Sequence, residues 1–125
     1  MNLPHNHNED ATACQFLQEK IGDTENFQAV ADVFKQLGDC TRLRIFWILC
    51  HCEECVMNVS AMVRMSSPAV SHHLKLLKAT GLITSRRVGK EVYYKAAQTE
   101  LVYQLHNMIE QMVEITCPNS KLEGN

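Results

Sequence analysis

The sequence predicts a mainly α-helical fold that carries one small β-hairpin. Apolar residues recur at three- and four-residue steps in several segments, as they do along one face of an amphipathic helix. In the middle of the chain, a short helical segment is followed after a few residues by a serine-rich helix start, which is the spacing of a helix-turn-helix. Beyond Gly81 the pattern changes to strand, turn and strand. This order is typical of a winged helix-turn-helix, in which the hairpin is the wing.

The segment before the helix-turn-helix is expected to form three helices. Residues 11–21 form the first, and residues 25–37 form an amphipathic second helix that ends at Gly38. Asp39 is expected to cap the third helix, because a carboxylate can accept a hydrogen bond from a free backbone N–H at a helix start. The third helix is apolar on nearly every side. We therefore expect it to be buried and to support the helix-turn-helix.

The helix-turn-helix itself begins with a short helix over residues 59–64, which Asn58 is expected to cap. Ser66 or Ser67 is expected to cap the second helix, and Pro68 fits its first turn, where a missing N–H costs nothing. The second helix places apolar side chains on one face and polar or cationic ones on the other.

The wing is expected to follow directly. Gly81 ends the second helix. Residues 82–87 and 91–95 are expected to pair as antiparallel strands around a turn at Val88-Gly89-Lys90.

A last helix is expected over residues 98–116, with a broad apolar stripe that the winged unit alone would leave exposed. Pairing this stripe with the first helix and with a second copy would bury it, so we expect a homodimer through the first and last helices. The alternative is that the last helix packs only on its own domain. The expected organisation is an N-terminal arm and first helix at 1–22, a winged helix-turn-helix domain at 23–97, a dimerisation helix at 98–116 and a tail at 117–125.

Charge is distributed unevenly along the chain. The net charge is −2, yet residues 64–95 hold seven Lys or Arg and a single acidic residue. Local positive charge is what phosphate neutralisation requires, so it favours double-stranded DNA as a partner over a merely solvated polar face. The sequence has no apolar run near 20 residues and no secretory signal, so we expect no membrane span and a cytoplasmic location.

Six cysteines in a chain without a secretory signal favour reduced thiols or metal ligands over a disulfide framework. Cys50, Cys52 and Cys55 stand within six residues, and they converge only if the third helix ends near Cys50. Converging thiolates would select Zn(II), Cd(II), Pb(II), Cu(I) or As(III). Cys50 also continues an apolar run and is equally explained as core. Further candidate ligands are Cys117, His5, His7, Cys14 and His106.

The central sequence resembles the ArsR/SmtB family of bacterial metal-sensing repressors. The resemblance is carried by Ser66 to Leu77, with its Ala-Val-Ser-His-His-Leu core, and by the wing residues Arg86-Arg87, Gly89-Lys90-Glu91 and Tyr93-Tyr94. It implies a homodimeric repressor that leaves its operator when an inducer, usually a thiophilic metal, binds. Two-fold symmetry would then predict an inverted-repeat operator with half-sites about 34 Å apart.

Nine residues are the candidates for DNA contact. Side chains on the second helix face the major groove, where hydroxyls and amines can read base edges, and the wing cations meet phosphates. The first group is Ser66, Ser67, Ala69, Ser71, His72 and Lys75, and the second is Arg86, Arg87 and Lys90.

The metal-ligand pattern departs from the family. Many members carry Glu-Leu-Cys-Val-Cys-Asp where this chain has Glu53-Glu54-Cys55-Val56-Met57-Asn58. Cys55 matches the first cysteine, but Met57 replaces the second and Asn58 replaces the aspartate. In members that use this region, ligands from the N-terminal arm join in. The family's other site, on the last helix, is mostly absent, because its positions hold Gln98, Glu100, Gln111 and Glu114.

The expected function is a metal- or metalloid-responsive DNA-binding repressor. One alternative keeps the fold but makes the trigger oxidation, with Cys52 and Cys55 forming a disulfide or a sulfenic acid. Another is a small metal-binding carrier protein, against which the basic wing argues. We do not expect an enzyme, because the sequence places no carboxylate or nucleophile beside His72 and His73.

Overall fold

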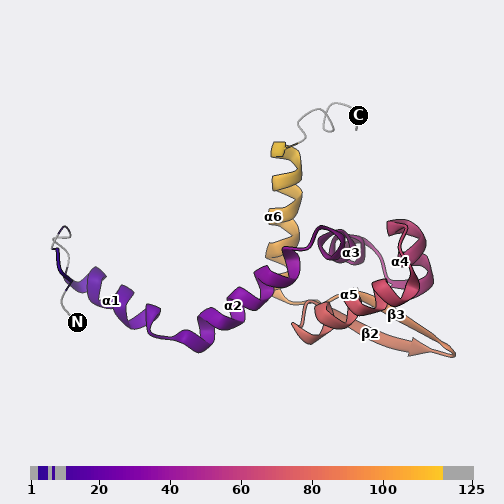
Figure 1. Ribbon diagram of the computed structural model, residues 1–125, viewed down its shortest axis with the longest axis horizontal. Helices are drawn as coiled ribbons and strands as arrows, with labels where there is room; N and C mark the ends of the chain where they lie inside the picture. The colour runs from indigo at the N-terminus through magenta and orange to yellow at the C-terminus, as the bar shows by residue number, and fades with distance from the viewer. Residues whose placement is uncertain (1–2, 6, 8–10, 117–125) are drawn as a thin grey trace. The chain divides into compact units, whose positions relative to one another are not determined.

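A computed structural model describes residues 3–5, 7 and 11–116 of the chain (Figure 1). It divides into two units, Met1–Phe34 and Lys35–Asn125. The first unit holds α1 (Ala11–Ile21) and most of α2 (Thr24–Leu37). Asp23 accepts a hydrogen bond from the backbone N–H of Asn26 at 3.3 Å, which stabilises the start of α2. Both helices lie within a residue of their predicted bounds.

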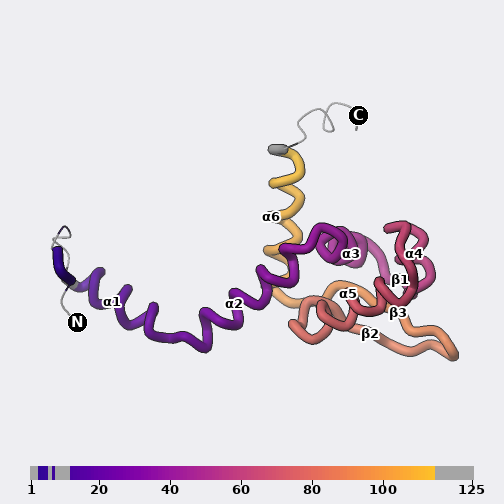
Figure 2. Tube along the Cα trace, viewed as in Figure 1, coloured from indigo at the N-terminus to yellow at the C-terminus, as the bar shows by residue number. Residues whose placement is uncertain are grey.

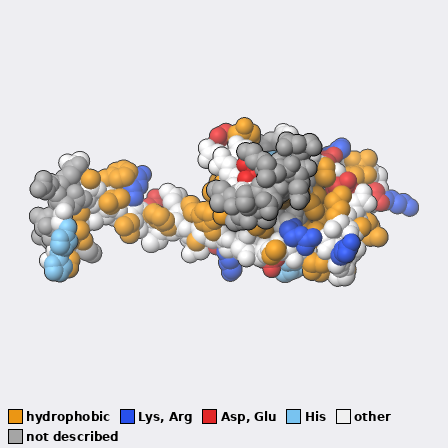
Figure 3. All heavy atoms as spheres, turned by 90° about the horizontal axis from the view of Figure 1, so that it is seen from above, with side chains coloured by type: hydrophobic (Ala, Val, Ile, Leu, Met, Phe, Trp, Pro, Cys, Tyr) orange, Lys and Arg blue, Asp and Glu red, His pale blue; other side chains and the backbone are white. Residues whose placement is uncertain are grey.

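Apolar side chains of the first unit remain exposed, and Figure 3 shows several of them as orange spheres. They come from both helices, and no side chain of α2 is buried. The exposed apolar residues of this unit's helices are Phe16, Leu17, Ile21, Phe27, Val30 and Phe34.

The second unit contains the predicted helix-turn-helix and wing (Figure 1). Helices α3, α4 and α5 pack on one another. Helices α3 and α4 also pack on β3, and α5 packs on β2. The core consists of their apolar side chains together with residues of β2 and α6. The elements are α3 (Cys40–His51), β1 (Glu54–Cys55), α4 (Val56–Val63), α5 (Ser67–Ala79), β2 (Ile83–Val88), β3 (Glu91–Ala96) and α6 (Glu100–Thr116).

Helix α3 begins as the sequence predicts. Asp39 accepts a hydrogen bond from the backbone N–H of Arg42 at 2.9 Å, and this bond lowers the pKa of the Asp39 carboxyl. The expectation that α3 is buried on nearly every side is wrong. Ile45 and Phe46 are fully buried, but Trp47 remains 40% exposed. Its indole N–H faces a carboxylate of α6 instead of the core.

Helix α4 begins earlier than predicted. Its N-cap is Cys55, which makes no side-chain capping bond, so the expectation that Asn58 caps the helix is wrong. The Asn58 side chain instead donates to Glu54 Oε2 at 2.7 Å, one turn back. Arg64 ends the helix in the left-handed region at φ 57°, which makes the tight turn into α5.

Helix α5 confirms the predicted caps. Ser66 Oγ accepts a hydrogen bond from the backbone N–H of Ala69 at 3.3 Å, with proline in the first turn. Val70, Leu74 and Leu77 are buried and hold the helix on the core. Gly81 has φ 76°, a conformation that side chains with a Cβ rarely adopt, and the chain turns there into the wing.

The hairpin also matches the prediction, but the sheet has a third strand. The order is β1-β3-β2, with antiparallel pairing throughout, and Figure 2 shows β1 beside β3. Cys55 of β1 is opposite Tyr93 of β3. The segment that carries the cysteines is therefore hydrogen-bonded to the wing.

Helix α6 joins the core by its first half only. Val102 and Leu105 are buried, whereas Leu101, Met108 and Met112 are 42–56% exposed. Across the described residues, no helix combines the length and apolar character that a membrane crossing requires.

Candidate functional site

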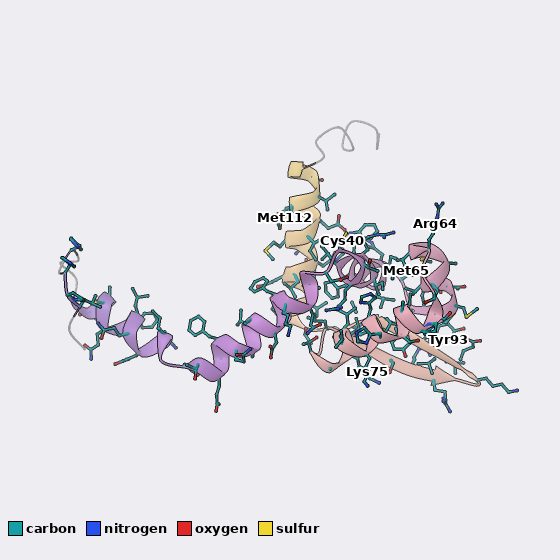
Figure 4. All side chains as sticks on the ribbon, viewed as in Figure 1. Cys40, Arg64, Met65, Lys75, Tyr93 and Met112 are labelled. Carbon is teal, nitrogen blue, oxygen red and sulfur yellow. The ribbon has the colours of Figure 1, made fainter. Side chains whose placement is uncertain are left out.

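The outer face of α5 presents polar side chains to solvent. Ser71, His72 and Lys75 are exposed there, on the opposite side of the helix from the buried Val70 and Leu74. Figure 4 shows Lys75 on the side of α5 that faces away from α3. An exposed hydroxyl, imidazole and amine on one helix face can form hydrogen bonds with base edges in a major groove.

The other predicted groove residues lie at the start of α5. Ser66 is the helix cap, and Ala69 is half-buried. Ser67 is also half-buried, and its Oγ lies 3.4 Å from Ser60 Oγ and 3.5 Å from Met57 Sδ. These contacts connect the start of α5 to α4.

The side chain of His73 forms a hydrogen bond within the fold. Arg42 Nε of α3 donates to His73 Nδ1 at 3.2 Å, and Arg42 also donates to the side chain of Gln36 at 2.5 Å. Burial lowers the pKa of His73 below its ordinary value, so the imidazole is neutral near pH 7 and can accept this bond. Of the two adjacent histidines, only His72 is exposed on the outer face.

The wing carries the predicted phosphate-binding cations, but one of them is already paired. Arg86 Nε donates to Glu53 Oε2 at 2.8 Å, and its Nη2 donates to Oε1 at 2.5 Å. The paired guanidinium lowers the pKa of Glu53, and the carboxylate raises that of Arg86. Arg87 and Lys90 are exposed near the wing turn. The sequence did not indicate the pair, because 33 residues separate its members.

The three central cysteines occupy three different backbone settings. Cys50 lies in the last turn of α3, Cys52 caps that helix in an extended conformation, and Cys55 belongs to β1. Burial, with a smaller contribution from the Glu110 charge, raises the pKa of Cys50 to about 11. Burial and then the Glu54 charge raise the pKa of Cys52. Both are therefore thiols, not thiolates, near pH 7 in the absence of a metal.

A different set of ligand-type side chains meets between α3 and α6. His51 Nε2 and His106 Nε2 each lie 2.9 Å from Glu110 Oε1, and the two nitrogens are 3.1 Å apart. Trp47 Nε1 donates to the same oxygen at 3.0 Å. These contacts lower the pKa of Glu110, with the His51 bond as the largest cause. Within the described part of the chain, this is the one group of three His, Cys, Asp or Glu ligand atoms that lie within 4.8 Å of one another.

The sequence indicated one member of this cluster. His106 is among the ligands predicted from the sequence, whereas His51 and Glu110 are not. His51 stands between Cys50 and Cys52, which carry the ligand pattern there. The signal that was present is the spacing from His106 to Glu110, which places both side chains on one helix face.

An open cleft lies beside the cluster. Its volume is about 570 Å³, and it is bounded by the end of α3, the end of β3 and the start of α6. Cys50, His51, Cys52 and His106 are among its lining residues. Two predicted thiol ligands thus border the same cleft as the two histidines, whereas Cys55 is not part of its lining.

The remaining predicted ligands belong to other parts of the chain. His5, His7 and Cys14 belong to the first unit, where the His5 and His7 rings stack with centroids 5.5 Å apart. Cys117 lies outside the described residues. Ligation by Cys50, Cys52, Cys55 and Cys117 stays a prediction.

Comparison with known proteins identifies the family. Residues 39–85, from the cap of α3 into β2, match the bacterial regulatory proteins of the arsR family. A transcriptional repressor SmtB homologue from Synechocystis sp. is 32% identical over 98 residues, which are 78% of this chain and 74% of the relative. The chain belongs to the arsR family. Its winged helix-turn-helix is accordingly the DNA-binding unit of a transcriptional regulator.

Two further comparisons agree with this assignment. A cadmium resistance transcriptional regulatory protein CadC homologue from Staphylococcus aureus is 44% identical over 71 residues, which are 56% of this chain and 59% of that relative. The solution structure of a homodimeric winged helix-turn-helix DNA-binding domain from Mycobacterium bovis, a possible ArsR-family regulator, has a TM-score of 0.68 at 29% identity. The match covers 75% of this chain and 87% of that domain.

Proposed function

We propose that this arsR-family regulator is a homodimeric repressor that releases its operator when a thiophilic metal or metalloid binds to thiolates around Cys52 and Cys55. The single observation that carries the proposal is the direct connection between the cysteine segment and the wing. Glu53, between the two cysteines, pairs with Arg86 of β2, and Cys55 is opposite Tyr93 of β3. A metal that moves this segment would change the position of a DNA-binding element.

The names of relatives support a metal inducer. The CadC homologue of Staphylococcus aureus is named for cadmium resistance, and ArsR2 of Pseudomonas putida, 36% identical over 80 residues, for arsenic resistance. The raised pKa values of Cys50 and Cys52 mean that a metal must displace protons to bind, so uptake by these thiols will strengthen as pH rises.

A homodimer is supported by the apolar side chains that each unit leaves exposed. Phe27 and Val30 of α2, and Met108 and Met112 of α6, are 42–56% exposed. Large apolar side chains left exposed on an amphipathic helix are typical of a protein interface. A two-fold dimer would present two α5 helices to successive major grooves of an inverted-repeat operator, about 34 Å apart, on DNA in the cytoplasm.

The test is an operator titration against a panel of inducers. A duplex selected from a random library by the reduced, metal-free protein is labelled, and its dissociation constant is measured by fluorescence anisotropy. Zn(II), Cd(II), Pb(II), Cu(I) and As(III) are added in turn. An allosteric coupling of about 1–3 kcal/mol would weaken operator binding roughly 5- to 150-fold for the cognate ion.

The controls separate the thiol site from unspecific metal effects. Cys52→Ser and Cys55→Ser should keep operator affinity and lose the response, whereas Cys40→Ser, which replaces an exposed cysteine at the start of α3, should keep both. A response to hydrogen peroxide but to no metal would favour the oxidation-triggered alternative. An unchanged affinity with every ion, with and without peroxide, would refute the sensing role.

A further inference from the structure

The contacts among His51, His106 and Glu110 form a closed triangle that hydrogen bonding alone cannot satisfy. Each histidine Nε2 lies 2.9 Å from Glu110 Oε1, and the two Nε2 atoms lie 3.1 Å apart. Each imidazole Nε2 has either one proton or one lone pair. If both nitrogens carry protons, the side between the two histidines is a contact between donors. If only one does, the other lone pair faces the carboxylate oxygen.

Changing the protonation of the other ring nitrogens does not remove this conflict. A doubly protonated histidine still has one proton on Nε2, so the three sides again cannot all be favourable. A single cation inside the triangle makes all three favourable at once, because two lone pairs and one carboxylate oxygen then point at a positive charge. Each ring keeps its proton on Nδ1.

We propose that His51, His106 and Glu110 form a nitrogen-and-oxygen binding site for one zinc-class divalent ion, distinct from the cysteine thiols. Tetrahedral zinc with bonds of about 2.0–2.1 Å separates its ligand atoms by about 3.3 Å. The observed sides are a few tenths of an ångström shorter, and side-chain rotation can supply the difference. His51 and Glu110 are 47% and 43% exposed, so solvent can reach the fourth position.

The surroundings of the triangle resemble the outer shell of a metal site. The Trp47 N–H donates to Glu110 Oε1 at 3.0 Å and orients the carboxylate, as outer-shell donors commonly do. The Trp47 and His51 rings have centroids 4.5 Å apart, and the His51 and His106 rings meet edge-on at 4.7 Å. These contacts position both imidazoles before any ion binds.

The donor set determines the class of ion. Two imidazoles and one carboxylate suit Zn(II), Co(II) and Ni(II), whereas As(III) and Cu(I) prefer sulfur. The site joins the last turn of α3 to α6 and lies on the cleft that Cys50 and Cys52 also border. The inference concerns metal binding alone, so its outcome does not depend on whether the thiol-triggered release proposed above is correct.

The experiment uses Co(II) as a spectroscopic probe and Zn(II) as its competitor. The full-length chain with Cys52→Ser and Cys55→Ser is titrated with Co(II) under reducing conditions. We expect one ion per protomer, visible d–d absorption without an intense thiolate-to-cobalt charge-transfer band, and displacement by Zn(II). Trp47 is the only tryptophan of the chain, so bound Co(II) should also quench its fluorescence.

Three further variants are made in the same background. His106→Gln and Glu110→Gln should each weaken Co(II) binding at least tenfold, while His72→Gln, which removes an exposed histidine of α5, should leave it unchanged. Circular dichroism of the metal-free proteins checks that helix content is retained, and either of the first two variants suffices if the other fails to fold. The proposal is overturned if the background protein takes up no Co(II), or if the folded variants bind it as tightly as the background does.

Discussion

The guanidinium of Arg86 in the wing is held by both carboxylate oxygens of Glu53, in the segment between two cysteines. A residue expected to meet phosphate is thus neutralised by the protein before DNA arrives. The Arg86 side chain is 60% exposed, and exposed ion pairs contribute only about 0.2–1 kcal/mol, so a phosphate can compete for it. The pair is therefore suited to adjusting DNA affinity.

Replacing Glu53 should strengthen DNA binding. In Glu53→Gln the arginine loses its charged partner, and we expect operator affinity to rise about two- to fivefold, the equivalent of up to about 1 kcal/mol. The logarithmic dependence of affinity on salt should become steeper by up to about one unit, since one more phosphate is neutralised. Fluorescence anisotropy between 50 and 200 mM salt, as rough limits, measures both quantities.

Glu54→Gln is the matched control for this experiment. It removes the same charge one residue away, from a side chain that pairs with Asn58 instead of the wing. If the two variants bind DNA equally well, the effect is one of net charge, and Arg86 is not restrained by Glu53.

The exposed face of α5 should determine which operator is bound. Lys75→Ala removes an exposed amine, and we expect it to weaken binding to the preferred operator by about 1–3 kcal/mol, with a much smaller effect on unrelated DNA. Lys78→Ala on the same helix is the control, because its amine already donates to Ser85 Oγ at 2.7 Å. Competition assays with both duplexes measure the ratio. An equal loss on both would reduce Lys75 to a phosphate contact.

Most of the fold was predictable because its determinants are local. Asp39 and Ser66 cap helices within three residues of themselves, and Gly81 turns the chain where its positive φ is required. Strand β1 was missed because two residues cannot show an alternating pattern, and its pairing with Tyr93 is set by tertiary contact. Trp47 was wrongly assigned to the core for a similar reason, since its partner Glu110 lies 63 residues away.

The candidate site was less predictable than the fold. The sequence predicts a ligand site at three closely spaced cysteines. In the described residues, the ligand atoms that lie together instead belong to His51, between two of those cysteines, and to His106 and Glu110 of α6. His51 and His106 are 55 residues apart, and only the docking of α6 on α3 brings them together. Spacing along a chain identifies ligands within one element, but it does not identify ligands that two elements share.

Truncating a buried side chain of α5 should destabilise the domain. Leu74 is 1% exposed, and Leu74→Ala should lower the free energy of unfolding by about 2–5 kcal/mol, because it removes apolar contacts and leaves a cavity. Urea denaturation followed by circular dichroism measures the loss. Met62→Ala, at a side chain that is 47% exposed, should change stability much less. Equal effects of the two substitutions would mean that α5 is not held by its buried face.

The pKa of Cys50 should be visible in its chemical reactivity. Its folded value is raised to about 11 from an ordinary 9.0, mainly by burial, so at pH 8 the reactive thiolate is a very small fraction of the population. Alkylation by iodoacetamide should therefore be slower at Cys50 than at the exposed Cys40, and the Cys50 rate should rise about tenfold per pH unit until pH approaches 11. Because the unfolded chain loses the Cys50 proton at a lower pH than the folded chain does, the raised pKa also makes folding less favourable above about pH 9.

Mass spectrometry of proteolytic peptides gives the alkylation rates of Cys50 and Cys40. A Cys50 rate that equals that of Cys40 at pH 8 and levels off below pH 9 would contradict a buried, neutral thiol.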